Sequence, residues 1–410
     1  MPRLRITLAV LTLLTASAHA QTFEQFTFLR LHEAPMSVRS AGMGAATEAA
    51  SPDLADLAAN PAATAAMKKR VISIGIAQDA RDFHGIGFAG GFPTTKIYPL
   101  RATDLAHAAI AIPLRGVSLG AYYRNEPRLS DPYAKTIEGP NIPYTPSCTE
   151  KDCFYFFGIM PSFERRERRY GITAAAEAGA LSFGAGVEMR ELNEELDLAR
   201  VAFLGSVAPP ERVFREVSDR DAVVNAGIRW RATPRVALAL AYNGAGSFTR
   251  TTSACTVDVH DLSRCVTSKA AIGASEQRMP DAYRGSISFK HSERLMLVGE
   301  LVRRNYSNLR NDAYSVIGTA ETLPYRDVTE LHAGAEYRVA SLPIALRAGW
   351  WRDPARLRGF AGNIPAISSD DDVEHTTFGA AWYAGDSRID LSLDSAQDVR
   401  RASIAFVHSF

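Results

Sequence analysis

Residues 37–63 read SVRSAGMGAATEAASPDLADLAANPAA, and this stretch decides how the rest of the chain is interpreted. Most of its side chains are small. Ser51, Pro52 and Asp53 supply an N-cap hydroxyl, a proline suited to the first helical turn and an acid at the positive helix end. They predict a short helix over about residues 52–59, whose alanine-rich faces suit a tight cavity.

An Asn-Pro-Ala turn follows this helix. Pro61 disfavours helical geometry at Asn60, so we expect the chain to turn there. The Asn60 side chain is then free to hydrogen-bond with its own neighbouring backbone. We interpret the whole stretch as a plug that fills the interior of a membrane barrel.

The composition allows such a barrel and excludes other classes. The 410 residues exceed the usual single-core size, which leaves two domains or one large barrel. No run of eighteen or more apolar residues occurs, so spanning helices are excluded, whereas a barrel turns only alternate residues toward lipid. The formal net charge of +1 gives no basic footprint for nucleic acid.

The first twenty residues have the pattern of a secretory signal peptide. Arg3 and Arg5 precede an apolar stretch over residues 6–14, and Ala-His-Ala stands just before Gln21. We expect the mature chain to begin at Gln21. No cysteine stands at the cleavage point, so the pattern predicts export without a lipid anchor.

From about residue 70 the chain alternates between apolar and polar residues in segments of about ten, the period of β-strands. Aromatic residues indicate that the apolar face meets lipid, because amphipathic rings gather at both edges of a membrane barrel and a soluble sandwich has no reason to sort them so. The apolar face carries Trp230, Phe289, Tyr337 and Trp382 just before short turns, and Tyr123, Tyr242 and Trp350 where strands enter long loops.

Short and long connections alternate along the chain, as in outer-membrane barrels with brief periplasmic turns and extended external loops. This pattern predicts an all-β, transmembrane antiparallel barrel of about fourteen strands, with sixteen as the weaker alternative. Residues 83–92 and 153–160 are apolar but are assigned to external loops. The expected strands cover about residues 70–78, 104–113, 116–124, 162–178, 180–191, 220–232, 234–245, 281–290, 293–306, 327–339, 342–352, 375–385, 386–396 and 398–410.

Several motifs resemble one family. Residues 39–44 read RSAGMG, and residues 278–284, RMPDAYR, lead a strand. Residues 331–337, LHAGAEY, are followed by IALRAGW at residues 344–350. Together with the Asn-Pro-Ala turn, these motifs resemble the FadL/TodX family of outer-membrane transporters for hydrophobic compounds and related PorV-type barrels. The last strand, with Phe406 and Phe410, resembles the signal read by the bacterial barrel-assembly machinery.

The resemblance implies a signal peptide over residues 1–20, a hatch or plug over residues 21–69 and an outer-membrane barrel over residues 70–410. It implies a hydrophobic small-molecule ligand held between hatch and wall, in a Gram-negative-type outer membrane whose lipid and lipopolysaccharide surround the barrel. No cofactor or metal is expected. The hatch and ligand residues are Gly42, Met43, Gly44, Asn60, Pro61 and Ala62.

The predicted lumen face carries charges of both signs. Glu336 and Arg347 fall opposite one another across a short turn and predict a cross-strand ion pair. Glu300, Arg284 and His332 complete the main network, which we interpret as holding the hatch and solvating the wall. The other members are Glu188, Arg190, Arg229, Arg231, Glu330, Arg338, Arg388, Asp390 and Asp394.

Four cysteines lie in two long loops. Local disulfides Cys148–Cys153 and Cys255–Cys265 are the simplest pairing in an oxidising compartment, although four cysteines allow three connectivities. A four-thiolate zinc site across both loops is the alternative, but paired C-x2-C knuckles are absent.

Two other functions compete with transport. An enzyme would need a nucleophile and a base at one rim, and His332 is the best candidate base, but no G-x-S-x-G accompanies it. We therefore expect a non-enzyme. A PorV-type barrel would share the hatch motifs and serve as a docking partner in protein secretion instead of a conduit.

Overall fold

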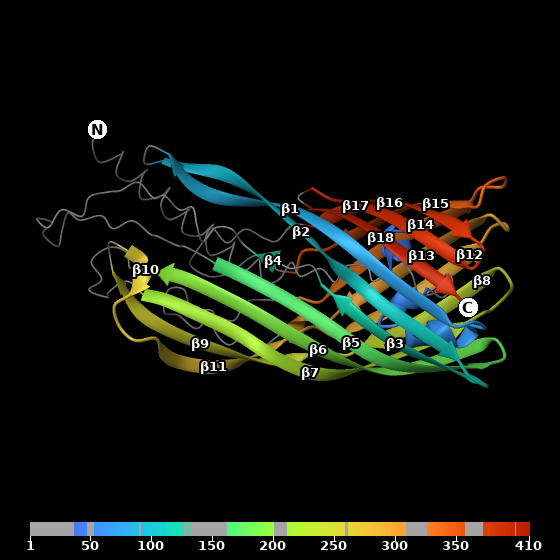
Figure 1. The fold of residues 1–410 in the computed structure, drawn as a ribbon, viewed down its shortest axis with the longest axis horizontal. Helices are drawn as coiled ribbons and strands as arrows, with labels where there is room; N and C mark the ends of the chain where they lie inside the picture. Colours follow the sequence, from blue (N-terminus) through green and yellow to red (C-terminus); the bar gives the residue numbers. More distant parts are fainter. Residues whose placement is uncertain are drawn as a thin grey trace, which may run out of the picture.

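The protein is a closed antiparallel β-barrel of fourteen strands with part of its N-terminal region inside (Figure 1). The computed structural model describes residues 37–46, 53–89, 92–126, 129–130, 162–200, 211–258, 261–308, 326–356, 372–397 and 399–410. The expected signal peptide and the residues around Cys148 and Cys153 lie outside these ranges, as does the apolar segment 153–160.

The barrel strands follow one another around the wall in chain order, as expected for an up-and-down barrel. Their bounds are β1 Val71–Ala89, β2 Phe92–Pro113, β3 Val117–Asn125, β5 Ser162–Ala178, β6 Leu181–Arg200, β7 Glu211–Trp230, β8 Val236–Asn243, β12 Ala282–Lys290, β13 Leu295–Arg304, β14 Val328–Arg338, β15 Ile344–Asp353, β16 Val373–Ala384, β17 Ser387–Ser395 and β18 Val399–Ser409.

Four further strands lengthen the wall at one end without adding to the count. β9 (Ser247–Asp258) continues β8 along β7, and β11 (Ala270–Arg278) leads into β12 while pairing with β9. β10 (Asp261–Cys265) pairs with the tip of β9, and β4 (Leu129–Ser130) pairs with β5 beyond β3. The sheet is therefore fourteen strands around, as expected from the sequence.

The first and last strands close the barrel. β1 pairs with β18 in the register Val71 to Ser409, and on its other side β1 pairs with β2. Arg70 and Phe410 exchange two backbone hydrogen bonds, of 3.1 and 2.9 Å. No edge of the wall is left open here, which is how a barrel satisfies its backbone groups in lipid.

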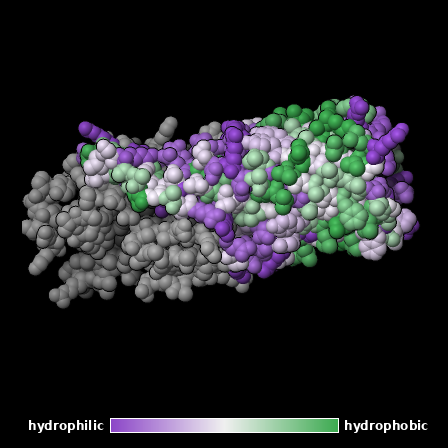
Figure 2. Space-filling model, turned by 90° about the horizontal axis from the view of Figure 1, so that it is seen from below, coloured by the Kyte–Doolittle hydropathy of each residue, from purple (hydrophilic) through white to green (hydrophobic). Residues whose placement is uncertain are grey.

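The outer surface carries a band of exposed apolar side chains toward the end with the short turns, flanked by hydrophilic residues (Figure 2). The alternation expected from the sequence is therefore correct, with the apolar face outside. Trp230, Phe289, Tyr337 and Trp382 are exposed at one border of this band. Such rings border the hydrocarbon layer in membrane barrels.

Several segments expected to be loops are strands. Of residues 83–92, the described ones belong to β1, up to Ala89, and to the start of β2 at Phe92, and Phe83 pairs with Tyr98. β6 and β7 pair out to Arg200 and Glu211, and most of the predicted loop over residues 246–280 forms β9, β10 and β11. These strands extend past the others at the end away from the short turns (Figure 1).

In the described part of the chain, no helix has the length and apolar character needed to cross a membrane.

Candidate functional site

Residues 37–46 and 53–67, here called the inner segment, lie inside the barrel. The first part forms the short helix α2 (Val38–Ala41), in which the Ser37 side chain caps the Ser40 N–H at 2.9 Å. Every residue from 37 to 44 is buried, and Arg39 is 4% exposed. An arginine so buried needs a partner, which the wall supplies.

The second part contains two 3-10 helices rather than the expected longer helix. η1 spans Leu54–Asp56 and η2 spans Pro61–Ala66. Asn60 separates them in an extended conformation, and its Oδ1 accepts a 2.9 Å hydrogen bond from the Ala62 N–H. The predicted turn at Asn60 is thus confirmed, whereas the helix over residues 52–59 is shorter than expected.

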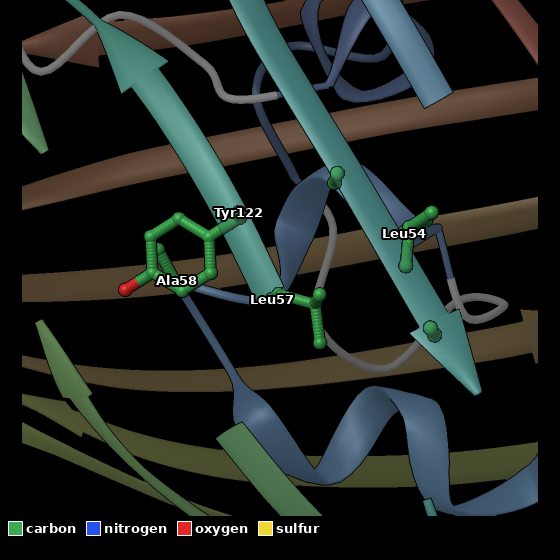
Figure 3. Packing of buried hydrophobic residues seen from close by; sticks show 6 residues of the cluster. Leu54, Leu57, Ala58 and Tyr122 are labelled. Atoms are coloured by element: carbon green, nitrogen blue, oxygen red, sulfur yellow. The ribbon is translucent and has the colours of Figure 1, made fainter. Parts of the chain in front are cut away.

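Apolar contacts join the inner segment to two sides of the wall. Leu54, Leu57 and Ala58 pack against Ala109, Ala111 and Tyr122 of β2 and β3 (Figure 3). Met43 and Ala46 pack against Met296 and Val298 of β13. These clusters are the apolar surfaces shared by the inner segment and the wall.

Inward-facing glycines let the inner segment lie directly against the wall backbone. A Cβ on Gly227 of β7 would lie 2.0 Å from Asn60 Oδ1, and one on Gly184 of β6 would lie 2.3 Å from the Ala62 nitrogen. A Cβ on Gly349 of β15 would lie 2.1 Å from the Gly44 nitrogen. Sequence reasoning missed these residues, although glycines at inward strand positions were a usable signal.

A chain of alternating charges crosses the wall and joins both parts of the inner segment. Arg39 donates to both oxygens of Glu336, at 2.8 and 3.1 Å, and Arg347 donates to the same carboxylate at 2.9 Å. Arg347 also donates to Asp390 at 2.6 Å. The predicted Glu336–Arg347 pair is present, and it belongs to a larger chain than the sequence indicated.

The chain continues back to the inner segment. Arg388 of β17 donates to Asp390 at 2.6 Å and to Asp53 at 2.7 Å. The six groups therefore run from Arg39 to Asp53 through β14, β15 and β17 with matched charges. Removing one partner from such a buried set costs about 3–5 kcal/mol, because the remaining charge is left without compensation.

Asp56 lies buried beside this charge chain. Burial, followed by the neighbouring charge of Asp53, raises the pKa of the Asp56 carboxyl well above 3.8. Arg39 and a hydrogen bond from Ser37 act in the opposite direction without cancelling the increase. The inner segment therefore holds one carboxyl group for which ionisation is unfavourable.

Three further polar contacts hold the backbone of the inner segment. The Gly44 N–H donates to Thr377 Oγ1 at 2.8 Å, and the Gly44 carbonyl lies 2.8 Å from His332 Nδ1. Asn243 donates to the Ala58 carbonyl at 2.7 Å. Arg284 in turn donates to Asn243 at 3.0 Å and to Glu300 at 3.0 Å, so these two predicted network residues position Asn243.

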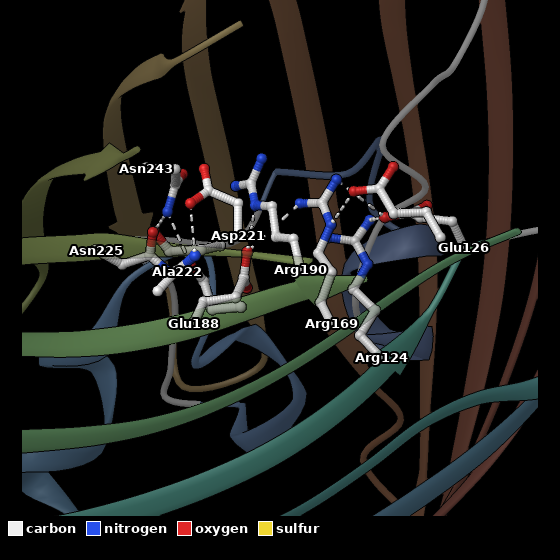
Figure 4. Close-up of polar contacts among 12 residues, drawn as sticks. Arg124, Glu126, Arg169, Glu188, Arg190, Asp221, Ala222, Asn225 and Asn243 are labelled. Atoms are coloured by element: carbon white, nitrogen blue, oxygen red, sulfur yellow. Dashed lines mark hydrogen bonds and ion pairs between the residues drawn. The ribbon is translucent and has the colours of Figure 1, made fainter. Parts of the chain in front are cut away.

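A second polar network covers the inner face of β3, β5 and β6 (Figure 4). Tyr122, which packs on Leu57, donates to Glu188 at 2.7 Å, and Arg190 donates to the same carboxylate at 2.7 Å. Arg169 donates to Glu167 at 2.7 Å and lies 3.9 Å from Glu188. The interior beside the apolar contacts is therefore strongly polar.

The predicted hatch residues lie on the inner segment in two groups. Gly42, Met43 and Gly44 are buried against β14, β15 and β16, whereas Asn60, Pro61 and Ala62 are buried against β6 and β7. The remaining predicted wall charges divide by position. Arg231 and Arg338 are exposed at the short turns. Glu330, His332 and Asp394 are buried on the inner face.

His332 is surrounded by an aromatic ring, a carboxylate and the backbone of the inner segment. Its ring stacks on Trp351, and Trp351 stacks on His375, with ring centroids 5.5 and 3.7 Å apart. His332 Nε2 lies 3.5 Å from Glu330. Its Nδ1 lies 2.8 Å from the Gly44 carbonyl, so this ring nitrogen holds the inner segment to the wall.

Cys255 and Cys265 form a disulfide, with Cα atoms 5.7 Å apart, as the sequence predicts. It ties the end of β9 to β10. Among the described residues, no three His, Cys, Asp or Glu side chains gather to hold a metal ion. Phe406 and Phe410 are exposed at the end of the chain, and their role in assembly stays a prediction.

These features define a class: a fourteen-stranded barrel with the inner segment, residues 37–46 and 53–67, inside it. No protein-family model matches the sequence, and no curated protein matches it. Solved structures do match. A FadL homologue from Pseudomonas aeruginosa is 12% identical, with 92% of this chain and 98% of that chain covered and a TM-score of 0.64.

Two toluene transporters have the same fold. TbuX from Ralstonia pickettii is 17% identical, with coverage of 93% of this chain and 100% of that chain and a TM-score of 0.62. TodX from P. putida is 15% identical, with coverage of 90% and 97% and a TM-score of 0.59. The chain therefore has the FadL/TodX-type barrel fold, which confirms at the level of fold the resemblance found in its motifs.

Proposed function

We propose that the protein is an outer-membrane transporter for apolar small molecules of the FadL/TodX type, and not an enzyme. The observation that carries the proposal is that the inner segment lies inside the barrel, held by buried charges and glycine contacts. An open barrel of this width would pass water and ions, so a plug of this kind permits selective passage. The similar solved structures include two toluene transporters, which supports an apolar ligand.

In this proposal the ligand rests between the inner segment and the wall and passes when the inner segment moves. The surfaces around Leu57 and Met43 supply apolar contact on the two sides of the barrel. The charge chain from Arg39 to Asp53 is the element that must rearrange, because it joins the inner segment to three strands. Ligand binding would act by favouring the rearranged state.

Deletion of residues 21–63 tests the plug. The remaining barrel is expected to insert and to conduct ions in planar bilayers, whereas the full chain stays closed. Unchanged conductance of the deletion variant would contradict the proposal.

Substitution of Asn60 and Pro61 is expected to loosen the inner segment and reduce uptake of an apolar probe such as toluene. Normal uptake would count against hatch movement.

Native mass spectrometry of protein extracted from its membrane distinguishes transport from a role in protein secretion. A bound apolar small molecule is the expected result. Recovery of the barrel with secretion proteins and no small molecule would favour the PorV-type alternative. Transport is preferred because two of the three similar structures reported above are toluene transporters.

A further inference from the structure

The outer face of the wall has an apolar hollow where β16, β17, β18, β1 and β2 lie side by side (Figure 1). Its volume is about 560 Å³, and no charged side chain lines it. Five of the lining residues are large apolar side chains exposed on the outer face, namely Ile76, Phe378, Leu391, Leu393 and Ile404. The hollow therefore opens toward the membrane and suits an alkyl chain.

Small side chains among these larger ones create the hollow. In the strand register, Ala402 of β18 stands between Leu393 of β17 and Gln78 of β1. Ala380 of β16 stands beside Leu391 of β17. The methyl groups of the two alanines reach less far from the wall than their neighbours, so space is left above them.

Two exposed arginines follow the hollow on the side away from the short turns. Ala80 of β1 pairs with Arg400 of β18 on one side and with Arg101 of β2 on the other. Neighbouring strands are about 4.8 Å apart, so the backbones of the two arginines are about 10 Å apart. Only a methyl group stands between them. Within the described residues, neither arginine forms an ion pair.

Another part of the wall has the same arrangement with a carboxylate in the middle. On the outer face, Glu191 of β6 pairs with Arg168 of β5 and with Arg220 of β7 in the strand register. Its carboxylate lies 3.4 Å from Arg168 and 3.2 Å from Arg220. The protein thus supplies the anion there, whereas at Ala80 an anion would have to come from the surroundings.

The depth of the arginines in the membrane indicates what that anion is. Residues 400–410 match the roughly 9–11 residues that a tilted strand needs to cross the hydrocarbon layer. Phe410 is exposed at the end with the short turns, so Arg400 lies at the opposite border. On β1 the exposed residues change from Ile76 to Gln78 on the way to this border. A group bound there lies where lipid chains join their head groups.

We propose that this surface docks a phosphate-bearing lipid of the leaflet away from the short turns. The phosphate lies between Arg101 and Arg400, and an acyl chain of the lipid fills the hollow over Ala402. Guanidinium groups suit phosphate because they donate to two of its oxygens at once. This inference rests on the membrane placement in the proposed function and not on transport. Since both arginines are exposed, the attraction weakens as salt is added.

The test compares phosphatidic acid with diacylglycerol of the same acyl chains, which lacks only the phosphate. Each lipid is added to the full chain in neutral detergent micelles, and native mass spectrometry measures the amount bound. Wild type is compared with Arg101→Gln/Arg400→Gln and with Ala80→Glu, which keeps both arginines and places a carboxylate between them. Arg168→Gln/Arg220→Gln is the matched control, because its two outward arginines already have a carboxylate partner. Circular dichroism checks that each variant is folded.

Wild type and the control are expected to prefer phosphatidic acid. Loss of both Arg101 and Arg400 is expected to weaken its binding by roughly thirtyfold, because each basic residue near an anionic lipid contributes to the attraction. Ala80→Glu is expected to weaken it to a similar degree, since the new carboxylate takes the place of the phosphate. Ala402→Trp fills the hollow and is expected to weaken binding of both lipids.

Equal binding of the two lipids by wild type, an equal loss in the control, or unchanged binding by Ala80→Glu would overturn the proposal. Unchanged binding by Ala402→Trp would also overturn it, because the acyl chain would then lie elsewhere. Displacement of phosphatidic acid by an equal concentration of glycerol phosphate would show a site for free phosphate and not for a lipid. None of these measurements involves conductance or uptake, so failure here is distinct from failure of the proposed transport.

Discussion

Glu336 binds two arginines at once, Arg39 from the inner segment and Arg347 from the neighbouring strand. The side chain of Glu336 is 4% exposed, and that of Arg347 is fully buried. Both charges are thus far from water, where ion pairing is least screened. The attachment of the inner segment depends on this one carboxylate more than on any single apolar contact.

Substitution of Glu336 by Gln tests that dependence. The variant removes the carboxylate that Arg39 and Arg347 share, so the inner segment is expected to be held about 3 kcal/mol less strongly. Single-channel recordings in planar bilayers should then show more frequent openings than wild type. The control is Arg303→Gln, which removes an exposed pair with Asp327 at 3.1 Å and should leave the recordings unchanged. Closed recordings from Glu336→Gln would show that the charge chain does not hold the plug.

Asp56 predicts a pH dependence. Its pKa in the folded protein is raised by burial and by Asp53, so the folded state binds the proton more tightly than the unfolded chain. The stabilisation from this group is present below pH 3.8 and is lost as the pH rises toward the folded pKa.

Asp56→Asn is therefore expected to be more stable than wild type near neutral pH. The difference in the free energy of unfolding should grow as the pH rises above about 4. Urea unfolding of both proteins in micelles at several pH values measures it. A difference that is independent of pH, or a less stable variant at neutral pH, would contradict this reading of Asp56.

At the scale of elements, η2 and its N-cap Asn60 lie directly against the backbone of β6 and β7 at two glycines. Gly227 and Gly184 make this approach possible, because any side chain there would overlap Asn60 or Ala62. Helix propensity contributes little in so short a 3-10 element. The shape of the wall therefore positions η2, in agreement with the buried extended conformation of Asn60.

Gly227→Ala is expected to displace η2 from β7 and to raise ion conductance. Gly273→Ala on β11 is the matched control, because a Cβ there meets nothing within 4 Å. Both changes add one methyl group to a strand, so any shared effect reports strand propensity alone. Equal conductance of the two variants would show that the close approach at Asn60 is unimportant for closure.

The strand pattern explains which elements could be predicted. Where a strand crosses the apolar band, one face meets lipid and the other the polar interior, so apolar and polar residues alternate. β6 and β7 extend past the band as sequences such as RELNEELDLAR, where charged residues stand on both faces. The regular alternation of apolar and polar residues is lost there, and the sequence is typical of a loop. The Arg39–Glu336 contact was equally hidden, because its residues lie 297 positions apart.

The whole molecule places apolar side chains outside and charges inside, the reverse of a soluble domain. Leu240 on β8 is 66% exposed within the outer band, and Val266 is 56% exposed beyond it, after β10. A soluble protein would gain little from either arrangement. In a membrane, only Leu240 is stabilised by hydrocarbon.

Substitution by arginine at Leu240 and at Val266 measures how much more the hydrocarbon layer stabilises the first position than the second. Leu240→Arg is expected to cost about 2–4 kcal/mol of folding free energy in lipid vesicles, and Val266→Arg no more than about 1 kcal/mol. Denaturant titrations of vesicle-inserted protein give both values. Similar costs at the two positions would contradict the placement of the band in the bilayer.

Strand number, closure and the outward apolar face could be predicted because each depends on local alternation and on the spacing of turns. The position of the plug could be predicted only through motif resemblance, since small residues carry no information about what they touch. The charges of the chain from Arg39 to Asp53 lie in the interior, as expected. Their partners could not be predicted, because they depend on how α2, β14, β15 and β17 are placed against one another.

The inward glycines leave space at the wall for the inner segment, so the two parts are complementary in shape. In a chimera that joins the barrel of this chain to the leading segment of another transporter, that space would still match Asn60, Ala62 and Gly44. Such an exchange should produce a leaky pore unless the inward glycines travel with the segment that they accommodate. Engineering a new cargo in this scaffold therefore means redesigning both halves together.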